Sequence, residues 1–197
     1  MKKTAVVYWS GTGNTEAMAK AVAEGMESAG AQVTMLTPDQ VKASELSAYD
    51  AIAFGCPAMG SEVLEEMEFQ PMFDSIKNQM GGKAVGLFGS FGWGDGEWMR
   101  SWEKDCDDAG INRVCDSITC CEAPDDDVLA ACQAMGVHCV YIASVGASTY
   151  GANQPELTFP DMALRLWQDG ELATAPALVT PGGQDDCGCD MDQDLLE

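Results

Sequence analysis

The chain has 197 residues, of which 46% are hydrophobic and 21% charged, a balance that allows one domain with a sizeable core. Its formal net charge of −22 argues against nucleic-acid binding, because that binding depends on Lys and Arg neutralising phosphates. No continuous apolar stretch approaches the ~20 residues of a transmembrane helix, so the sequence predicts no membrane insertion.

The acidity and the cysteines bear on partners and compartment. A strongly acidic surface favours protein partners with basic docking faces, although acidity can also serve only solubility. The nine cysteines, in a chain without a recognisable signal peptide, are typical of reduced thiols rather than of a disulfide framework. We therefore expect a cytoplasmic protein that is a monomer or a weak dimer.

The first motif lies between a predicted strand and a predicted helix. Residues 5–8 form a short apolar run, and Met18, Val22 and Met26 recur every four residues in the segment that follows, up to Gly30. Glycines, a helix start and neutral hydroxyl or amide side chains between strand and helix can hold a phosphate. The six residues of this loop are Ser10, Gly11, Thr12, Gly13, Asn14 and Thr15.

Two better-known phosphate motifs are excluded here. The loop has no lysine, so it is not a Walker A site, and Glu16 stands where the dinucleotide fingerprint has its third glycine. Neutral donors alone suit a single phosphate ester. The alternative is a polar turn that only caps the helix.

The next elements indicate a parallel sheet. Residues 32–36 predict a second strand, residues 41–46 a weak helical crossover and residues 49–55 a third strand that shows little alternation. This β-α-β-α-β order favours helices on both faces of the sheet. Ligands of such sheets bind beyond the carboxyl ends of the strands, where the first loop is expected.

A second candidate loop follows the third strand, at residues 56–62, and leads to a helix predicted over residues 69–80. Met59 is a polarizable side chain suited to an aromatic face, Gly60 tolerates positive φ, and Glu62 is an acceptor near a ring system. The alternative is an ordinary loop with a proline turn and an acidic helix start.

A third loop, at residues 91–98, follows a strand predicted over residues 83–90. Trp93 lies between two glycines, which makes it a poor core anchor and a good stacking surface for a flat ring. Trp98 and Trp102, four residues apart on the next predicted helix, are expected to pack in the core.

We assign no ligand-binding residue to the last predicted strand and helix. Residues 113–120 predict a fifth strand, and a final helix begins near residue 124 and runs through Gly136. We interpret His138, the only histidine, as structural, and the adjacent Cys120 and Cys121 as buried thiols.

With these three loops, residues 1–136 resemble a short-chain flavodoxin of the clostridial type, an electron carrier that holds FMN. The resemblance implies a flavodoxin-like α/β three-layer sandwich with a five-stranded parallel sheet in the order 2-1-3-4-5. It implies an FMN-binding domain at residues 1–146. Residues 147–197 are a C-terminal extension, expected to pack partly on the domain and to end in a disordered acidic stretch with Cys187 and Cys189.

The resemblance also implies roles for individual residues. Residues 10–15 would bind the phosphate of FMN, Met59 and Trp93 would enclose its ring, and the carbonyl of Gly60 would accept a hydrogen bond from flavin N5–H on reduction. Glu62 would contact flavin N3. The remaining residues implied in cofactor binding are Pro57, Ala58, Ser61, Ser90, Phe91, Gly92 and Gly94.

The function implied is electron transfer at low potential, in one- or two-electron steps, between redox enzymes. We predict no catalytic residue and no metal site, because the redox chemistry belongs to the cofactor. The alternative is an FMN-dependent NAD(P)H:acceptor oxidoreductase, for instance a quinone reductase, on the same fold.

Overall fold

The structure is a computed structural model, and it describes residues 1–145. The predictions made for residues 147–197, including their packing on the domain and any role of Cys187 and Cys189, lie outside the described residues. They remain predictions, and truncation after Ala152 with a measurement of the melting temperature would test the packing.

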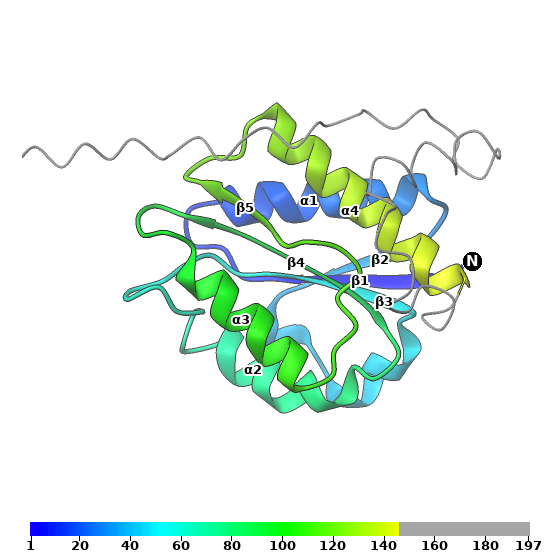
Figure 1. Ribbon diagram of the computed structural model, residues 1–197. Coiled ribbons are helices and arrows are strands. Elements are labelled where there is room, and N and C mark those ends of the chain that lie inside the picture. Colours follow the sequence, from blue (N-terminus) through cyan, green and yellow to red (C-terminus); the bar gives the residue numbers. More distant parts are fainter. Residues whose placement is uncertain (146–197) are drawn as a thin grey trace, which may run out of the picture.

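Five parallel strands form one sheet in the order β2-β1-β3-β4-β5 (Figure 1). The order confirms the predicted topology. The strands are β1 (Lys3–Tyr8), β2 (Gln32–Leu36), β3 (Ala51–Gly55), β4 (Ala84–Phe91) and β5 (Ile118–Cys121).

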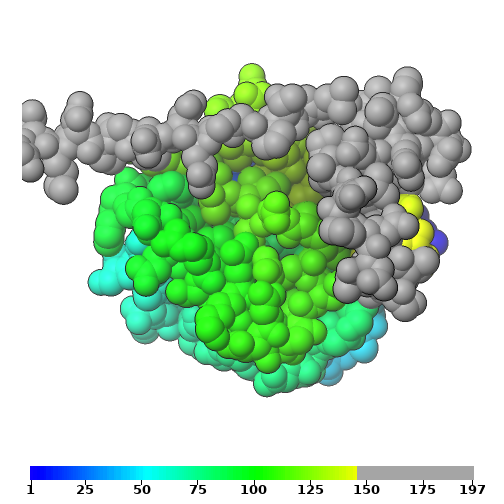
Figure 2. All heavy atoms as spheres, in the orientation of Figure 1, coloured from blue at the N-terminus to red at the C-terminus, as the bar shows by residue number. Residues whose placement is uncertain are grey.

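Helices cover both faces of the sheet. Figure 1 shows α1 and α4 on one side and α2 and α3 on the other. The helices are α1 (Asn14–Ser28), α2 (Phe69–Ile76), α3 (Glu97–Asp108) and α4 (Asp126–Val145). In the space-filling view (Figure 2), green atoms of the middle of the chain, which includes α3, cover much of the face turned to the viewer.

Two apolar layers hold the helices to the sheet. On the α2 and α3 side, Phe69, Phe73 and Trp102 pack edge-to-face or in parallel with ring centroids 5.4–6.4 Å apart. Trp98 and Trp102 are almost completely buried, which confirms the expectation that they pack in the core. All five residues of β3 are buried, which explains why its sequence shows no alternation.

Two interior glycines let α1 and α4 approach closely on the other side. A Cβ atom at Gly25 would lie 1.9 Å from the carbonyl oxygen of Gln133, and one at Gly136 would lie 2.1 Å from that of Val22. Helix α4 therefore passes through Gly136 as predicted, because the glycine is a contact point and not a helix end.

Helix α4 meets the length and apolar composition of a membrane span, a property that the sequence analysis missed. Its Cys132, Met135 and Cys139 are nevertheless buried in the layer shared with α1 and the sheet. Buried core helices can also have this length and apolar composition, so these two properties are weak evidence that α4 spans a membrane.

Three predicted elements differ from the structure. The strand predicted over residues 113–120 is a single bridge between Val85 and Arg113, followed by an irregular stretch and then β5. The side chain of Arg113 pairs with Glu103 and Asp107, and these contacts hold the irregular stretch beside α3.

The other two differences concern helix type. The crossover predicted over residues 41–46 consists of two 3₁₀ segments, Pro38–Gln40 and Ala43–Ala48. The helix predicted over residues 69–80 is α2 followed by a 3₁₀ turn, Lys77–Gln79. Short segments of this kind are too brief for a periodic apolar pattern to separate the helix types.

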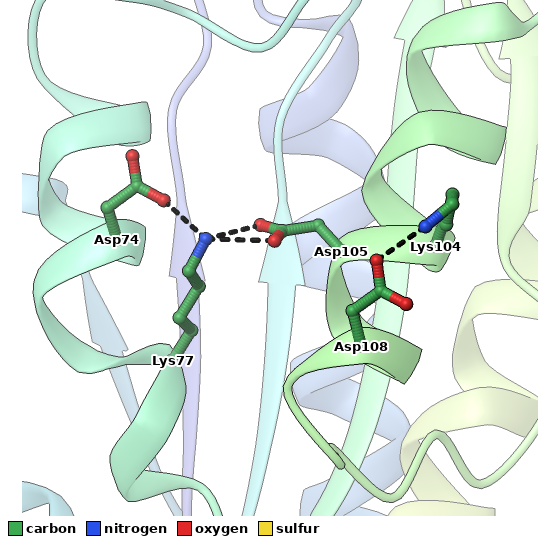
Figure 3. A network of polar contacts seen from close by, with 5 residues as sticks. All are labelled: Asp74, Lys77, Lys104, Asp105 and Asp108. Atoms are coloured by element: carbon green, nitrogen blue, oxygen red, sulfur yellow. Dashed lines mark hydrogen bonds and ion pairs between the residues drawn. The ribbon is translucent and has the colours of Figure 1, made fainter.

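The 3₁₀ turn after α2 carries an ionic contact to α3. Figure 3 shows the ammonium of Lys77 between the carboxylates of Asp74 and Asp105, at N–O distances of 2.8–2.9 Å. The hydrogen bond to Asp105 is the main cause that raises the pKa of Lys77, and the hydrogen bond to Asp74 raises it further. Lys104 and Asp108 form a further pair on the exposed side of α3 (Figure 3).

Candidate functional site

The three predicted loops meet at one end of the sheet, on the left in Figure 1 and opposite the N-terminus. The strand register explains this meeting, because Tyr8 pairs with Gly55, and Gly55 pairs with Phe88 in the next strand. Residues 56–58 continue beside β4, with the N–H of Cys56 bonded to the carbonyl of Phe88 and that of Ala58 to the carbonyl of Ser90.

The first loop, residues 10–15, leaves the start of α1 open. Gly13 precedes the helix with a φ of 93°, and its N–H donates to the hydroxyl of Ser10 at 3.1 Å. In the described part of the chain, no side chain caps the first turn of α1, so its N–H groups remain available to an anion. Gly11, Thr12 and Gly13 are exposed at this position.

The second loop contains a tight turn at residues 59–63. Two backbone hydrogen bonds of 2.8 and 3.0 Å join Met59 and Val63, and Gly60 and Glu62 in the turn have φ values of 48° and 52°. Met59 is 36% exposed. Pro57 and Ala58, before the turn, are half-buried, and Ser61 at its tip is exposed.

The third loop continues from β4 into α3. Ser90 is buried and Phe91 half-buried against Trp98, whereas Gly92, Trp93 and Gly94 are exposed. Trp93, with 60% of its surface exposed, is the most exposed aromatic residue of the described chain. An indole in this position offers its face to a flat ligand.

Hydrogen bonds connect the loops to one another. The hydroxyls of Thr15 and Ser90 lie 3.1 Å apart and both are buried, so the first and third loops are joined beneath the surface. The indole N–H of Trp9, next to the first loop, donates to the carboxylate of Glu68 at 3.0 Å. The side chain of Glu62 bonds to the backbone at the start of α3.

A buried carboxylate supports the second loop, and the sequence analysis did not recognise it. Glu65 is 6% exposed and accepts hydrogen bonds of 2.8 Å from the N–H groups of Met67, Glu68 and Phe69. Burial acts to raise the pKa of Glu65, but the three backbone donors outweigh it and lower the pKa. An acidic residue just before a predicted helix was the available signal.

Glu65 also fixes Cys56. The N–H of Glu65 lies 3.3 Å from the sulfur of Cys56, and the indole N–H of Trp98 donates to the Cys56 carbonyl at 3.2 Å. Burial raises the pKa of the Cys56 thiol to about 12, so the thiol is inert as a nucleophile. Cys56 is therefore an anchor of the loop.

The residues present fit FMN. The open start of α1 and the neutral side chains of Ser10, Thr12 and Asn14 form a donor set for one phosphate, and exposed Met59 and Trp93 at the same end of the sheet suit an aromatic ring. Two hollows of about 350 and 250 Å³ lie elsewhere, and neither is lined by a predicted site residue.

His138 does not take part in this end of the sheet. It is buried in α4, and burial lowers its pKa to about 4. No disulfide joins any of the seven cysteines in residues 1–145.

Comparisons with known proteins show the family to which the chain belongs. Residues 6–135 match the flavodoxin family model. The chain is 44% identical over 121 residues to a flavodoxin from Megasphaera elsdenii, which is 61% of this chain and 88% of that protein. It is 50% identical over 99 residues to a flavodoxin from Clostridium beijerinckii, and the aligned region covers 50% of this chain and 72% of that protein.

The fold is similar to the solution structure of two-electron reduced Megasphaera elsdenii flavodoxin. The TM-score is 0.64 at 39% identity, covering 70% of this chain and 98% of that one. The family model, these relatives and the sheet order agree, and the chain belongs to the flavodoxin family of FMN-dependent electron carriers.

Proposed function

We propose that FMN binds across the three loops at the carboxyl ends of β1, β3 and β4. The uncapped start of α1 is the observation that carries this proposal, because an open helix terminus beside neutral donors suits a phosphate. In this proposal, Met59 and Trp93 contact the two faces of the ring and Gly60 offers its carbonyl to N5–H. When bound, FMN supplies the one- and two-electron chemistry.

The remaining residues of the three loops contribute by shape and hydrogen bonding. They are Gly11, Gly13, Asn14, Thr15, Pro57, Ala58, Ser61, Glu62, Ser90, Phe91, Gly92 and Gly94.

The phosphate assignment is tested by comparing FMN with riboflavin, which lacks the phosphate. Thr12→Ala and Asn14→Ala should weaken FMN binding by about tenfold while leaving riboflavin binding unchanged, as expected for one lost charge-assisted hydrogen bond. Trp93→Ala should weaken both flavins by a similar factor, because both carry the ring. The measurement is titration of the apoprotein followed by flavin fluorescence. Equal losses for both flavins in all three variants would contradict the assignment.

We further propose that this carrier docks on basic faces of its redox partner proteins. The net charge of −22 supports this, since opposite charges accelerate encounter. The rate of electron transfer to a basic redox protein, measured by stopped flow, should fall as ionic strength rises. A rate that is independent of salt would rule out electrostatic docking.

We place the protein in the cytoplasm as a monomer or weak dimer, with α4 as a core helix and not a membrane span. Cysteines that form no disulfide within residues 1–145 and the buried residues of α4 support this. The reductase alternative predicts steady oxidation of NADPH by the purified protein with a quinone as acceptor. A carrier shows none, and shows instead two reduction steps in a dithionite titration followed by absorbance.

A further inference from the structure

The side chain of Glu62 crosses from one loop to another. Glu62 belongs to the turn at residues 59–63, yet its Oε1 atom accepts hydrogen bonds from the N–H groups of Gly96, at 2.9 Å, and Glu97, at 3.2 Å. Those two residues are the N-cap and first residue of α3. A φ of 52° is uncommon for a glutamate, and the cross-loop contact explains why this backbone conformation is kept.

The third loop is shaped around this carboxylate. Gly94 has a φ of 94°, and a Cβ atom there would lie 2.3 Å from Cδ and 2.4 Å from Oε1 of Glu62. A side chain at residue 94 would therefore displace the carboxylate.

The local charges show what sustains the contact. Carboxylate oxygens of Asp95 and Glu97 lie within 4.8 Å of one another and of Glu62, and this repulsion alone would drive Glu62 away. Arg100 offsets part of it by pairing with Asp95 at 2.7 Å. The open N–H groups and the positive end of the α3 dipole supply the remaining attraction.

We propose that Glu62 is a positioning residue that joins the turn at residues 59–63 to the loop that carries Trp93. This inference rests on the proposed function, in which Met59 and Trp93 lie on the two faces of the flavin ring. Both hydrogen bonds between Glu62 and the start of α3 fall on its Oε1 atom, so the contact depends on one end of this carboxylate. A shift of the Gly60–Ser61 peptide is then transmitted to the Trp93 loop.

Two glycine variants separate this contact from backbone strain. Gly94→Ala forces Glu62 off the N–H groups without changing Glu62 itself. Gly96→Ala is the matched control, because its φ of 84° is similarly strained but its Cβ would meet nothing closer than 3.7 Å, an atom of Arg100. The strain is common to both variants, and only the first places an atom against Glu62.

The first measurement uses the flavin-free protein. Hydrogen exchange at the amides of residues 96 and 97, followed by NMR, should be at least about tenfold faster in Gly94→Ala than in Gly96→Ala, the factor expected for a lost charge-assisted hydrogen bond. Glu62→Ala should accelerate exchange like Gly94→Ala. Glu62→Gln keeps an acceptor oxygen and should restore much of the protection. Equal exchange in the two glycine variants would overturn the proposal.

The second measurement adds the flavin. Gly94→Ala should weaken FMN and riboflavin by the same factor relative to Gly96→Ala and should shift both reduction potentials, since the contact acts at the ring and not at the phosphate. Unchanged affinities and potentials, despite faster exchange, would overturn the positioning role. The proposed site fails separately if Trp93→Ala in an otherwise unaltered protein leaves binding of both flavins intact.

Discussion

At the scale of single residues, Gly60 is a position where backbone conformation alone decides the effect of a substitution. Its φ is 48°, and a Cβ atom there would meet nothing within 4 Å. Gly60→Val therefore acts through backbone strain, which costs about 1–3 kcal/mol. We expect a narrower separation between the two one-electron reduction potentials, measured by dithionite titration, because the turn can no longer readily present the Gly60 carbonyl.

Gly82→Val is the matched control for that prediction. Gly82 has a φ of 78° and equally open surroundings, and it precedes β4 at the opposite end of the sheet. The control should lose similar stability and keep both potentials. Identical potentials in the two variants would show that the turn at Gly60 has no special role.

His138 makes a second prediction at this scale. Burial lowers its pKa from 6.5 to about 4, so the folded protein holds the neutral imidazole. The unfolded chain binds a proton first as pH falls, so the contribution to stability is complete above about pH 6.5 and is lost toward pH 4. The difference between the pKa values of the unfolded and folded states corresponds to on the order of 3 kcal/mol in the free energy of unfolding.

Urea unfolding at about pH 7 and about pH 4.5 measures this contribution. The carboxylates titrate in every variant, so the informative quantity is the difference between the unaltered protein and His138→Gln. The stability of the variant should fall less between the two pH values. A parallel fall in both proteins would refute the assignment.

At the scale of elements, the crossing of α1 and α4 depends on glycines that touch backbone. A methyl group at Gly136 would lie 2.1 Å from the carbonyl oxygen of Val22, so the helices must separate. Gly136→Ala should destabilise the fold by about 1–3 kcal/mol despite the better helix propensity of alanine. Calorimetry should show the melting temperature falling by roughly 2–4 °C per kcal/mol.

Gly81→Ala provides the comparison for the helix crossing. Gly81 has open surroundings and no left-handed φ, so alanine there meets no atom and should leave the melting temperature unchanged or slightly raised. If Gly136→Ala behaves like Gly81→Ala, the close approach of α1 and α4 is not a determinant of stability.

At the scale of the whole molecule, the net charge of −22 acts against compactness. At a salt concentration of about 0.1 M, the repulsion between exposed carboxylates that lie more than about 10 Å apart is largely screened. We therefore expect the melting temperature to rise between about 0.01 M and about 0.5 M sodium chloride, followed by circular dichroism. A melting temperature that falls over this range would mean that the attractive surface pairs outweigh the repulsion.

The sequence by itself determined the alternation of strands and helices, the three loops and the packing of Trp98 and Trp102, whereas the sheet order was implied by the resemblance to flavodoxins. Each depends on local information: apolar periodicity marks the elements, glycines and prolines mark the turns, and parallel strands bring their carboxyl ends to one edge. Trp93 was found for the same reason, since it stands between two glycines, whereas Met59 was chosen for its polarizable side chain.

Only the tertiary structure decided how these loops are held. The joining of Thr15 to Ser90, of Trp9 to Glu68 and of Glu62 to the start of α3 links residues 34–75 positions apart. Neither periodicity nor spacing encodes such pairs, because they form when the strand register sets loop beside loop. The predicted fifth strand is likewise reduced to one bridge at Arg113, whose side chain pairs with Glu103 and Asp107 of α3, before β5 begins.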